Sequence, residues 1–176
     1  MTFGERLMTK PTMLFVSLAV ALVAGAVHAQ SAPAQSTSLY AAPQGFEPVA
    51  DPAPRDPSLT PVFEQFGGKA GLVALMNDFM DNLMADPRTR PFFDEADREH
   101  IKAELVDQFC VILDGPCTYT GKNMVQAHRG LDIHRSQFNA LVEDLQNAMD
   151  KHGIPFRAQN KLLAKLAPMH HQVVTK

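Results

Sequence analysis

Apolar side chains in residues 58–176 recur at intervals of three and four, the spacing of one face of an α-helix. One such run ends at Asp86-Pro87 and consists of Leu72, Leu75, Met76, Phe79, Met80 and Leu83. Another follows Asp97, a candidate helix cap, and consists of Ile101, Leu105, Phe109 and Ile112. No alternation typical of strands competes with these runs, so we expect an all-α fold.

Three further helices are expected in this region. Ser58 and Pro61 supply a cap and a first-turn proline for a short helix that ends at Phe66. Ser136 is the candidate cap of a helix whose inward positions are Phe138, Leu141, Val142, Leu145 and Met149. The last helix spans about 157–173, and Pro168 should bend it. Short helices broken by glycine and proline favour steep crossings around a pocket over a regular bundle.

Residues 1–57 differ in composition from the helical region. Arg6 and Lys10 precede an apolar run from 13 to 27, so residues 1–29 are interpreted as a secretory signal peptide. An uncleaved membrane anchor is the alternative. Residues 30–57 are rich in Ala, Pro, Ser and Gln, so we expect a flexible linker that contributes nothing to the fold. The prediction is a periplasmic or secreted protein without stable membrane insertion after signal cleavage, and a folded domain over 58–176.

Charge and cysteine usage exclude several classes of function. The formal net charge is −3 with the two signs interspersed, so no basic stripe predicts a nucleic-acid partner. The spacing of Cys110 and Cys117 fits neither a redox Cys-x-x-Cys pair nor a zinc site. In an oxidising compartment the two cysteines could form a local disulfide, and two buried thiols are the alternative.

His128 is the main candidate for chemistry. Met124 and Val125 precede it by four and three residues, and Leu131 follows it by three, so on a short helix the imidazole shares a face with apolar side chains. Two interpretations fit this pattern: a core histidine with a hydrogen-bond partner, or a single axial ligand to a haem iron. The spacing alone leaves both open.

The sequence around His128 resembles the proximal region of group I truncated haemoglobins. The matching residues are Gly115, Pro116, Tyr119, Gly121, Met124, His128, Gly130, Ile133 and Phe138, and the likeness extends from Leu59 to the C-terminus. It implies the truncated-globin fold, a two-over-two helical sandwich. It also implies one haem b, held non-covalently because no Cys-x-x-Cys-His motif occurs, and reversible binding of the diatomic gases O₂, NO and CO.

The same resemblance assigns roles to individual residues. His128 becomes the proximal iron ligand, and the apolar haem slot is formed by Phe79, Met80, Phe93, Ile101, Leu105, Phe109, Met124, Ile133 and Phe138. Met80 stands where many members have Tyr, and Ile101 and Leu105 stand where polar donors are expected. The distal side should therefore be apolar, with Gln108 and His100 as reserve donors or ligands.

Charge makes Lys102 and Lys122 candidates for contacts with the haem propionates. Two functions stay open at this stage. One is a haem protein that handles O₂, NO and CO with an unidentified redox partner, and the other is a globin-fold sensing or partner-binding module without haem chemistry. No dedicated catalytic motif occurs, so enzymatic activity is left undecided, and an apolar distal side weakens the case for NO dioxygenation.

Overall fold

The computed structural model describes residues 51–176 of the chain. The predicted signal peptide and the predicted linker as far as residue 50 lie outside the described residues. Within residues 51–176 all regular structure is helical, which confirms the expected all-α class. No helix in this range is long and apolar enough to cross a membrane.

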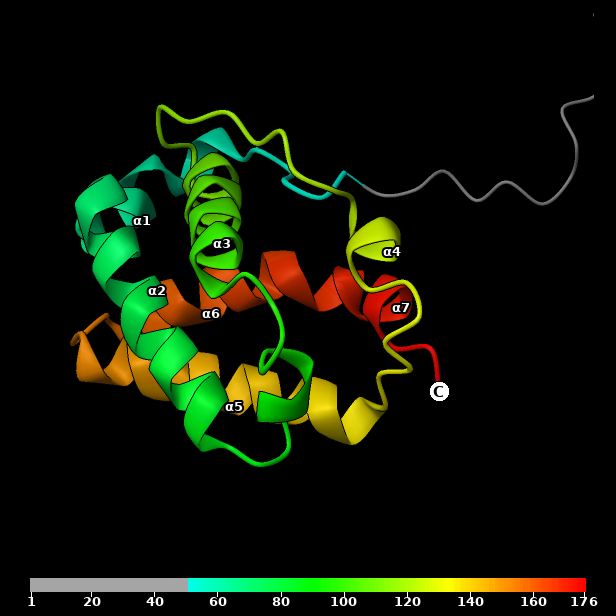
Figure 1. Cartoon of the computed structure of the whole chain (residues 1–176). Coiled ribbons are helices and arrows are strands. Elements are labelled where there is room, and N and C mark those ends of the chain that lie inside the picture. Colours follow the sequence, from blue (N-terminus) through cyan, green and yellow to red (C-terminus); the bar gives the residue numbers. More distant parts are fainter. Residues whose placement is uncertain (1–50) are drawn as a thin grey trace, which may run out of the picture. The chain divides into compact units, whose positions relative to one another are not determined.

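The described range contains seven α-helices and three short 3₁₀ helices, labelled η (Figure 1). In chain order they are η1 Pro57–Leu59, α1 Thr60–Gln65, α2 Gly68–Ala85, η2 Arg90–Phe92, α3 Arg98–Ile112, α4 Met124–Ala127, α5 Arg135–Lys151, α6 Phe156–Leu166, η3 Ala167–Met169 and α7 His170–Val173.

Four longer helices form the core of the domain. α2 packs against α3 and α5, and α6 contacts the same two helices, which gives the two-over-two arrangement (Figure 1). The predicted inward side chains of α2 are all buried, namely Leu72, Leu75, Met76, Phe79, Met80 and Leu83. The hydrophobic pattern of this helix therefore identified its core face.

Two consecutive glycines separate α1 from α2. Gly67 and Gly68 have φ values of 75° and 62°, in the left-handed region where a residue with a Cβ is disfavoured. This pair lets α2 begin directly after α1 in a new direction. The short helix predicted to end at Phe66 is thus confirmed, but its predicted cap is wrong, because Ser58 lies within η1 and Leu59 precedes α1 without a side-chain cap.

The boundaries of α3 and α5 confirm one predicted cap and correct another. The Asp97 carboxylate accepts a hydrogen bond from the His100 backbone N–H at 3.0 Å and caps α3, as predicted. The predicted Ser136 cap is wrong, because α5 begins at Arg135 and the His134 N–H donates to the Gln137 side chain at 2.8 Å. Pro168 interrupts the last helix as expected, since α6 ends at Leu166 and η3 follows it.

Residues 51–57 pack on the helical domain, although the sequence placed them in the flexible linker. Ala53 is 5% exposed and belongs to the core. The Gln108 side chain donates to the Pro52 carbonyl at 2.6 Å, and Lys165 forms an ion pair with Asp56 at 2.6 Å. The predicted domain start at Ser58 is therefore too late, because these backbone and side-chain groups have their partners inside the fold.

Candidate functional site

A single helical turn positions the imidazole of His128. Asn123 caps α4, since its side-chain oxygen accepts from the Gln126 N–H at 2.9 Å. His128 is the residue at the C-terminal end of this turn, and its Nδ1 lies 2.8 Å from the Met124 carbonyl oxygen. A carbonyl only accepts, so Nδ1 carries the proton and Nε2 presents a lone pair. This is the arrangement in which a second partner orients a metal-binding histidine.

The surroundings of His128 favour its neutral form. The residue is half-buried, and loss of hydration lowers the pKa of the imidazole, which the hydrogen bond to Met124 only partly opposes. Among residues 51–176, Nε2 has no hydrogen-bond partner of its own. A neutral imidazole with a free Nε2 is the form that ligates a metal.

The neighbours predicted for His128 are partly wrong. Met124 is half-buried and packs against the core, whereas Val125 is 39% exposed and Leu131 is 40% exposed. The prediction extended helical periodicity through His128, but α4 ends at Ala127. Leu131 therefore lies in a loop, where helical spacing no longer determines the direction of a side chain.

The predicted slot residues fall into two groups. Phe79, Met80, Phe109 and Ile133 are buried, with exposures between 2% and 8%. The other group is half-buried and consists of Phe93, Ile101, Leu105, Met124 and Phe138. Four members of this second group pack with one side against the core: Phe93, Ile101, Leu105 and Met124. Large apolar side chains left half-exposed on several elements form the kind of wall that an apolar ligand covers.

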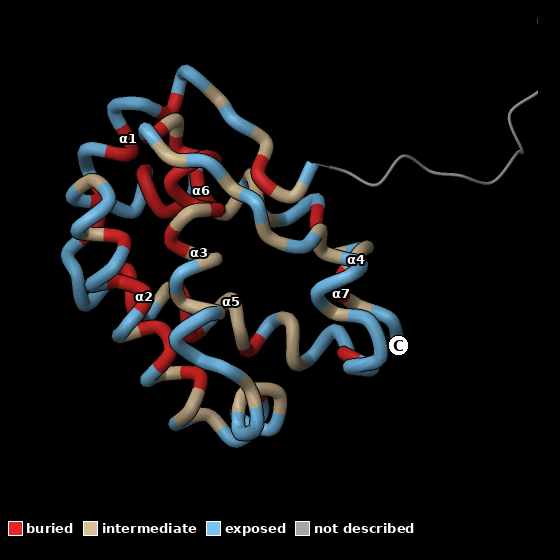
Figure 2. The backbone as a smooth tube through the Cα atoms, turned by 45° about the horizontal axis from the view of Figure 1, so that its top comes forward, coloured by how far each residue is buried: buried red, intermediate tan, exposed pale blue. Residues whose placement is uncertain are grey.

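The C-terminal end of the chain braces the loop that follows His128. α7 contacts α4, and the two lie side by side in both views (Figures 1 and 2). The Thr175 N–H donates to the Ile133 carbonyl at 3.0 Å, and the Lys176 ammonium lies 2.8 Å from Asp132. Sequence reasoning missed this brace, because no local pattern indicates a contact between residues so far apart in the chain.

The two reserve distal groups point elsewhere. Gln108 is 4% exposed, and its side-chain nitrogen donates to the Pro52 carbonyl and lies 3.9 Å from the sulfur of Met124, a predicted slot residue. The His100 side chain is 67% exposed and lies 4.0 Å from Glu104 on the next turn of α3. Neither contact directs a hydrogen-bond donor toward the predicted distal side chains Met80, Ile101 and Leu105.

The predicted propionate cations differ in their contacts. The Lys102 ammonium binds the Asn77 side-chain oxygen at 2.9 Å and Glu99 at 2.7 Å, so it is already engaged within the protein. Lys122 is exposed, and its ammonium has no partner in the described part of the chain. Of the two lysines, Lys122 is therefore the one whose ammonium is available for a contact with a haem propionate.

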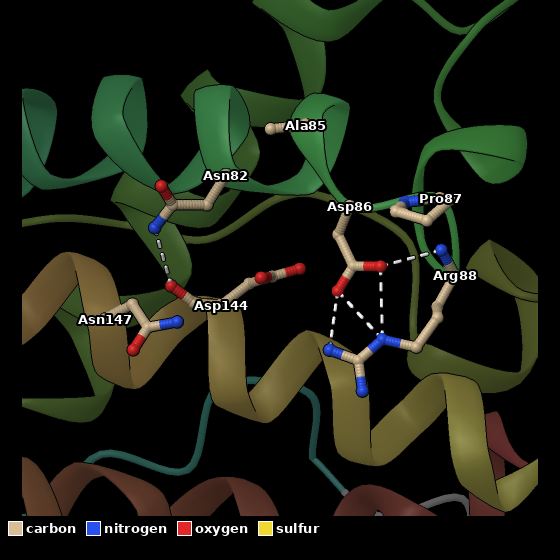
Figure 3. Close-up of a pocket in the computed structure, with 7 residues that line it drawn as sticks. All are labelled: Asn82, Ala85, Asp86, Pro87, Arg88, Asp144 and Asn147. Atoms are coloured by element: carbon tan, nitrogen blue, oxygen red, sulfur yellow. Dashed lines mark hydrogen bonds and ion pairs between the residues drawn. The ribbon is translucent and has the colours of Figure 1, made fainter.

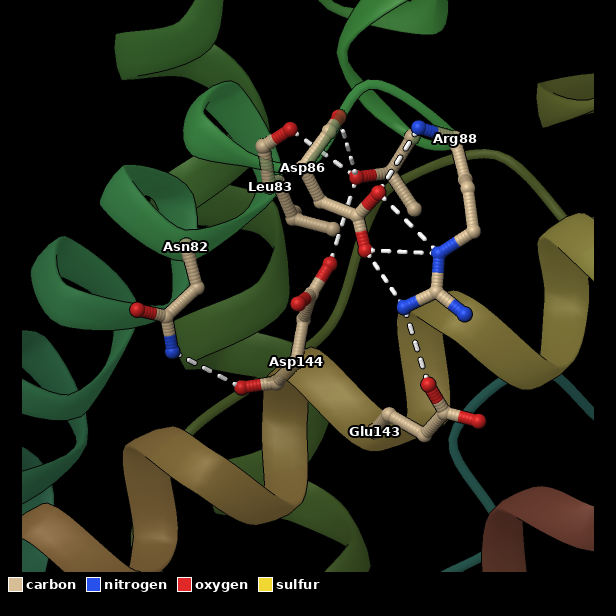
Figure 4. A network of polar contacts seen from close by, with 7 residues as sticks. Asn82, Leu83, Asp86, Arg88, Glu143 and Asp144 are labelled. Atoms are coloured by element: carbon tan, nitrogen blue, oxygen red, sulfur yellow. Dashed lines mark hydrogen bonds and ion pairs between the residues drawn. The ribbon is translucent and has the colours of Figure 1, made fainter.

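A surface pocket elsewhere in the domain has a different character. It lies where α2 faces α5 and is lined by Asn82, Ala85, Asp86, Pro87, Arg88, Asp144 and Asn147 (Figure 3). Arg88 spans Asp86 and Glu143 at 2.6 and 2.9 Å, and the pKa of Asp86 is lowered by the hydrogen bonds from Arg88 (Figure 4). These contacts close the turn after α2 onto α5, and none of the predicted slot residues takes part.

The residues present fit a haem. One neutral imidazole, oriented by the Met124 carbonyl, would supply the single protein ligand that a haem iron requires. Half-exposed apolar side chains on α3, α4 and α5 would supply a wall for the porphyrin.

Comparison with known proteins also indicates a haem protein. The model of the bacterial-like globin family matches residues 61–175. A group 1 truncated haemoglobin from Tetrahymena thermophila is 34% identical over 93 residues, covering 53% of this chain and 77% of the relative. The crystal structure of the Fe(III) truncated haemoglobin from Tetrahymena pyriformis superposes with a TM-score of 0.62 at 27% identity, covering 65% of this chain and 98% of that one.

A more distant structure shares the fold. The 2/2 haemoglobin of Synechococcus, in a cyanomet state with covalently attached haem, gives a TM-score of 0.58 at 20% identity, covering 63% of this chain and 94% of that one. The two-over-two sandwich expected from the resemblance is thereby confirmed. The chain belongs to the bacterial-like globin family and is a haem-binding globin whose relatives include group 1 truncated haemoglobins.

Proposed function

We propose that the protein holds one haem b non-covalently through Nε2 of His128 and reversibly binds O₂, NO and CO. The observation that carries this proposal is the 2.8 Å contact between His128 Nδ1 and the Met124 carbonyl, which leaves Nε2 free. When bound, the haem supplies an iron with an open coordination position for a diatomic gas. Membership in a family of haem-binding globins supports the same assignment.

The chain's own residues would determine which gas stays longest. Phe93, Ile101 and Leu105 would exclude water from the distal side, since all three are apolar and only half-buried without a ligand. Met80 lies in the core at 5% exposure and cannot donate a hydrogen bond. We therefore propose fast O₂ release and little discrimination against CO, because CO depends less on a donor.

The proximal role is tested by comparing two histidine variants. His128→Ala should abolish or severely weaken haem retention, measured by the Soret absorbance of purified protein and by titration with haemin. His134→Ala is the matched control, since His134 is exposed and contributes its backbone N–H to the start of α5. Equal loss of haem in both variants would show that His128 is the wrong ligand.

The alternative function is a sensing or partner-binding module with no haem-ligand chemistry. Unmodified protein that shows no Soret band and does not take up added haemin would favour it.

The mode of attachment is tested by acidified-ketone extraction of denatured protein, from which a non-covalent haem is released completely. Haem that stays on the polypeptide would indicate a covalent link, and His170, whose buried Nε2 has no partner within residues 51–176, would be the first nitrogen to examine.

Export through the predicted signal peptide is part of the proposal. The disulfide between Cys110 and Cys117 supports it, because disulfides persist mainly in oxidising compartments. Fractionation of cells followed by intact-mass measurement tests the localisation. A mature chain starting near Gln30 in the periplasmic or secreted fraction is expected, and full-length chain in the cytoplasmic fraction would contradict it.

A further inference from the structure

A disulfide lies at the start of the loop that leads to His128. Cys110 is in the last turns of α3 and is fully buried, while Cys117 is half-buried in the loop, with 5.9 Å between their Cα atoms. The sequence left the choice between a disulfide and two buried thiols open, and the structure decides for the disulfide. The loop continues from Cys117 to Asn123, the cap of α4.

Side chains from the N-terminal part of the domain hold the turn formed by residues 114–117. The Arg55 guanidinium donates at 3.0 Å to the carboxylate of Asp114 and to the carbonyls of Gly115 and Cys117. The Thr60 hydroxyl donates to the other Asp114 oxygen at 2.6 Å. The turn therefore has one covalent tie to α3 and one polar clamp to residues 55–60.

The rest of the loop has few restraints of its own. The Tyr119 hydroxyl donates to the Lys122 carbonyl at 2.7 Å, and Tyr119 packs against the core. Thr118, Thr120 and Lys122 are exposed. A helix as short as α4 is not stable by itself, so its position depends on its contact with α7 and on where the loop places Asn123. A restraint at Cys117 therefore acts on the helix that orients His128.

We propose that the Cys110–Cys117 disulfide is a redox-sensitive restraint on α4 that controls how firmly the protein retains haem. This inference rests on the proposed role of His128. Cys117 is half-buried and lines a surface recess together with Arg55 and Tyr119, so we expect a reductant to attack its sulfur rather than that of Cys110. Cys110, with no exposed surface, is the leaving group.

The partner reaction is thiol–disulfide exchange with a dithiol reductant. A thiolate of the reductant attacks Cys117 Sγ, the Cys110–Cys117 bond breaks, and Cys110 leaves as a thiolate that takes up a proton. The second thiol of the reductant then displaces Cys117, so the products are two protein thiols and one disulfide in the reductant. Oxidation by a protein disulfide reverses the exchange.

The test measures haem transfer from the full chain to an excess of an apoglobin acceptor, with and without a dithiol. Reduction should accelerate transfer about tenfold, equivalent to a change of about 1.4 kcal/mol in the barrier. A Cys110→Ala/Cys117→Ser variant should transfer haem at the fast rate in both conditions. This control separates loss of the disulfide from any effect of the dithiol on the iron. Equal rates for oxidised and reduced wild-type protein would overturn the proposal.

A second measurement does not depend on haem. Amide hydrogen exchange in residues 118–127 should become faster on reduction, while exchange in the middle of α2 stays unchanged. If the protein binds no haem but the exchange changes as expected, the proposed function fails and the restraint stands. If haem binds through His128 but reduction changes neither exchange nor transfer, the restraint fails and the proposed function stands.

Discussion

The carboxylate of Asp144 on α5 lies 3.2 Å from the hydroxyl of Thr89, in a buried contact that joins α5 to the turn after α2 (Figure 4). The Thr89 hydroxyl has one proton, which it shares between Asp144 and a shorter contact, 2.9 Å to the Leu83 carbonyl. Burial raises the pKa of the Asp144 carboxyl, and the hydrogen bond from Thr89 opposes this shift only in part.

Asp144→Asn should stabilise the protein at neutral pH. The amide can donate to Thr89 without a buried charge, so we expect a gain of about 1 kcal/mol in the free energy of unfolding. The folded pKa of Asp144 lies above its unfolded value, so the wild-type carboxyl is most favourable below the unfolded pKa of about 4. Its contribution is lost as the pH rises through the folded pKa.

Thermal melts across pH check this expectation. The advantage of Asp144→Asn should shrink towards pH 4 and vanish below it. Glu143→Gln is the matched control, because the Glu143 side chain is 55% exposed and its one ion-pair partner within residues 51–176 is the half-exposed Arg88. A lower melting temperature for Asp144→Asn at pH 7 would show that the ionised carboxylate stabilises this contact.

Met80→Tyr should slow O₂ release. The tyrosine hydroxyl would give the distal side a donor, and such a hydrogen bond is worth about 1–3 kcal/mol, or about one to two decades in the dissociation rate. Stopped-flow measurement of O₂ dissociation tests this, with Met80→Leu as the apolar control that should resemble wild type. Slow release already in the wild type, unchanged by the added tyrosine, would reveal an unidentified donor.

Gln108→Leu should leave O₂ dissociation unchanged and lower stability. The Gln108 side chain is buried, and its nitrogen donates to the Pro52 carbonyl at 2.6 Å. Removal of the donor leaves the Pro52 carbonyl unsatisfied, at a cost of about 1–3 kcal/mol. Stopped flow and chemical denaturation of the same sample measure both effects. Faster O₂ release in this variant would mean that Gln108 reaches the distal side after all.

Arg55→Ala should destabilise the domain by about 1 kcal/mol, because three hydrogen bonds end on its partly exposed guanidinium. Arg157→Ala is the control, since Arg157 is exposed and has no ion-pair partner within residues 51–176.

A chain that starts at Ser58 should melt below one that starts at Asp51. Equal melting temperatures for the two chains would restore the predicted boundary.

Local sequence determined the helices that carry a long apolar face. In α2, each turn places the next apolar residue on the same side, so Leu72 to Leu83 needed no tertiary information to be assigned to the core. The Asp97 cap followed from its short side-chain acceptor, and the interruption at Pro168 followed from the backbone N–H that proline lacks. The candidate ligand His128 followed from resemblance to a family, since its spacing alone left two interpretations open.

Only the tertiary structure decided features that depend on contacts between distant residues. Leu131 is exposed because the chain leaves the helix at Ala127, and no periodic pattern marks that end. Arg55 belongs to the domain because its partners begin 59 residues later in the chain. The Gln108 side chain is engaged by the Pro52 carbonyl, a partner 56 residues earlier in the chain. Periodicity records which face of a helix is apolar, but the partner of a polar side chain depends on which segments the fold brings together.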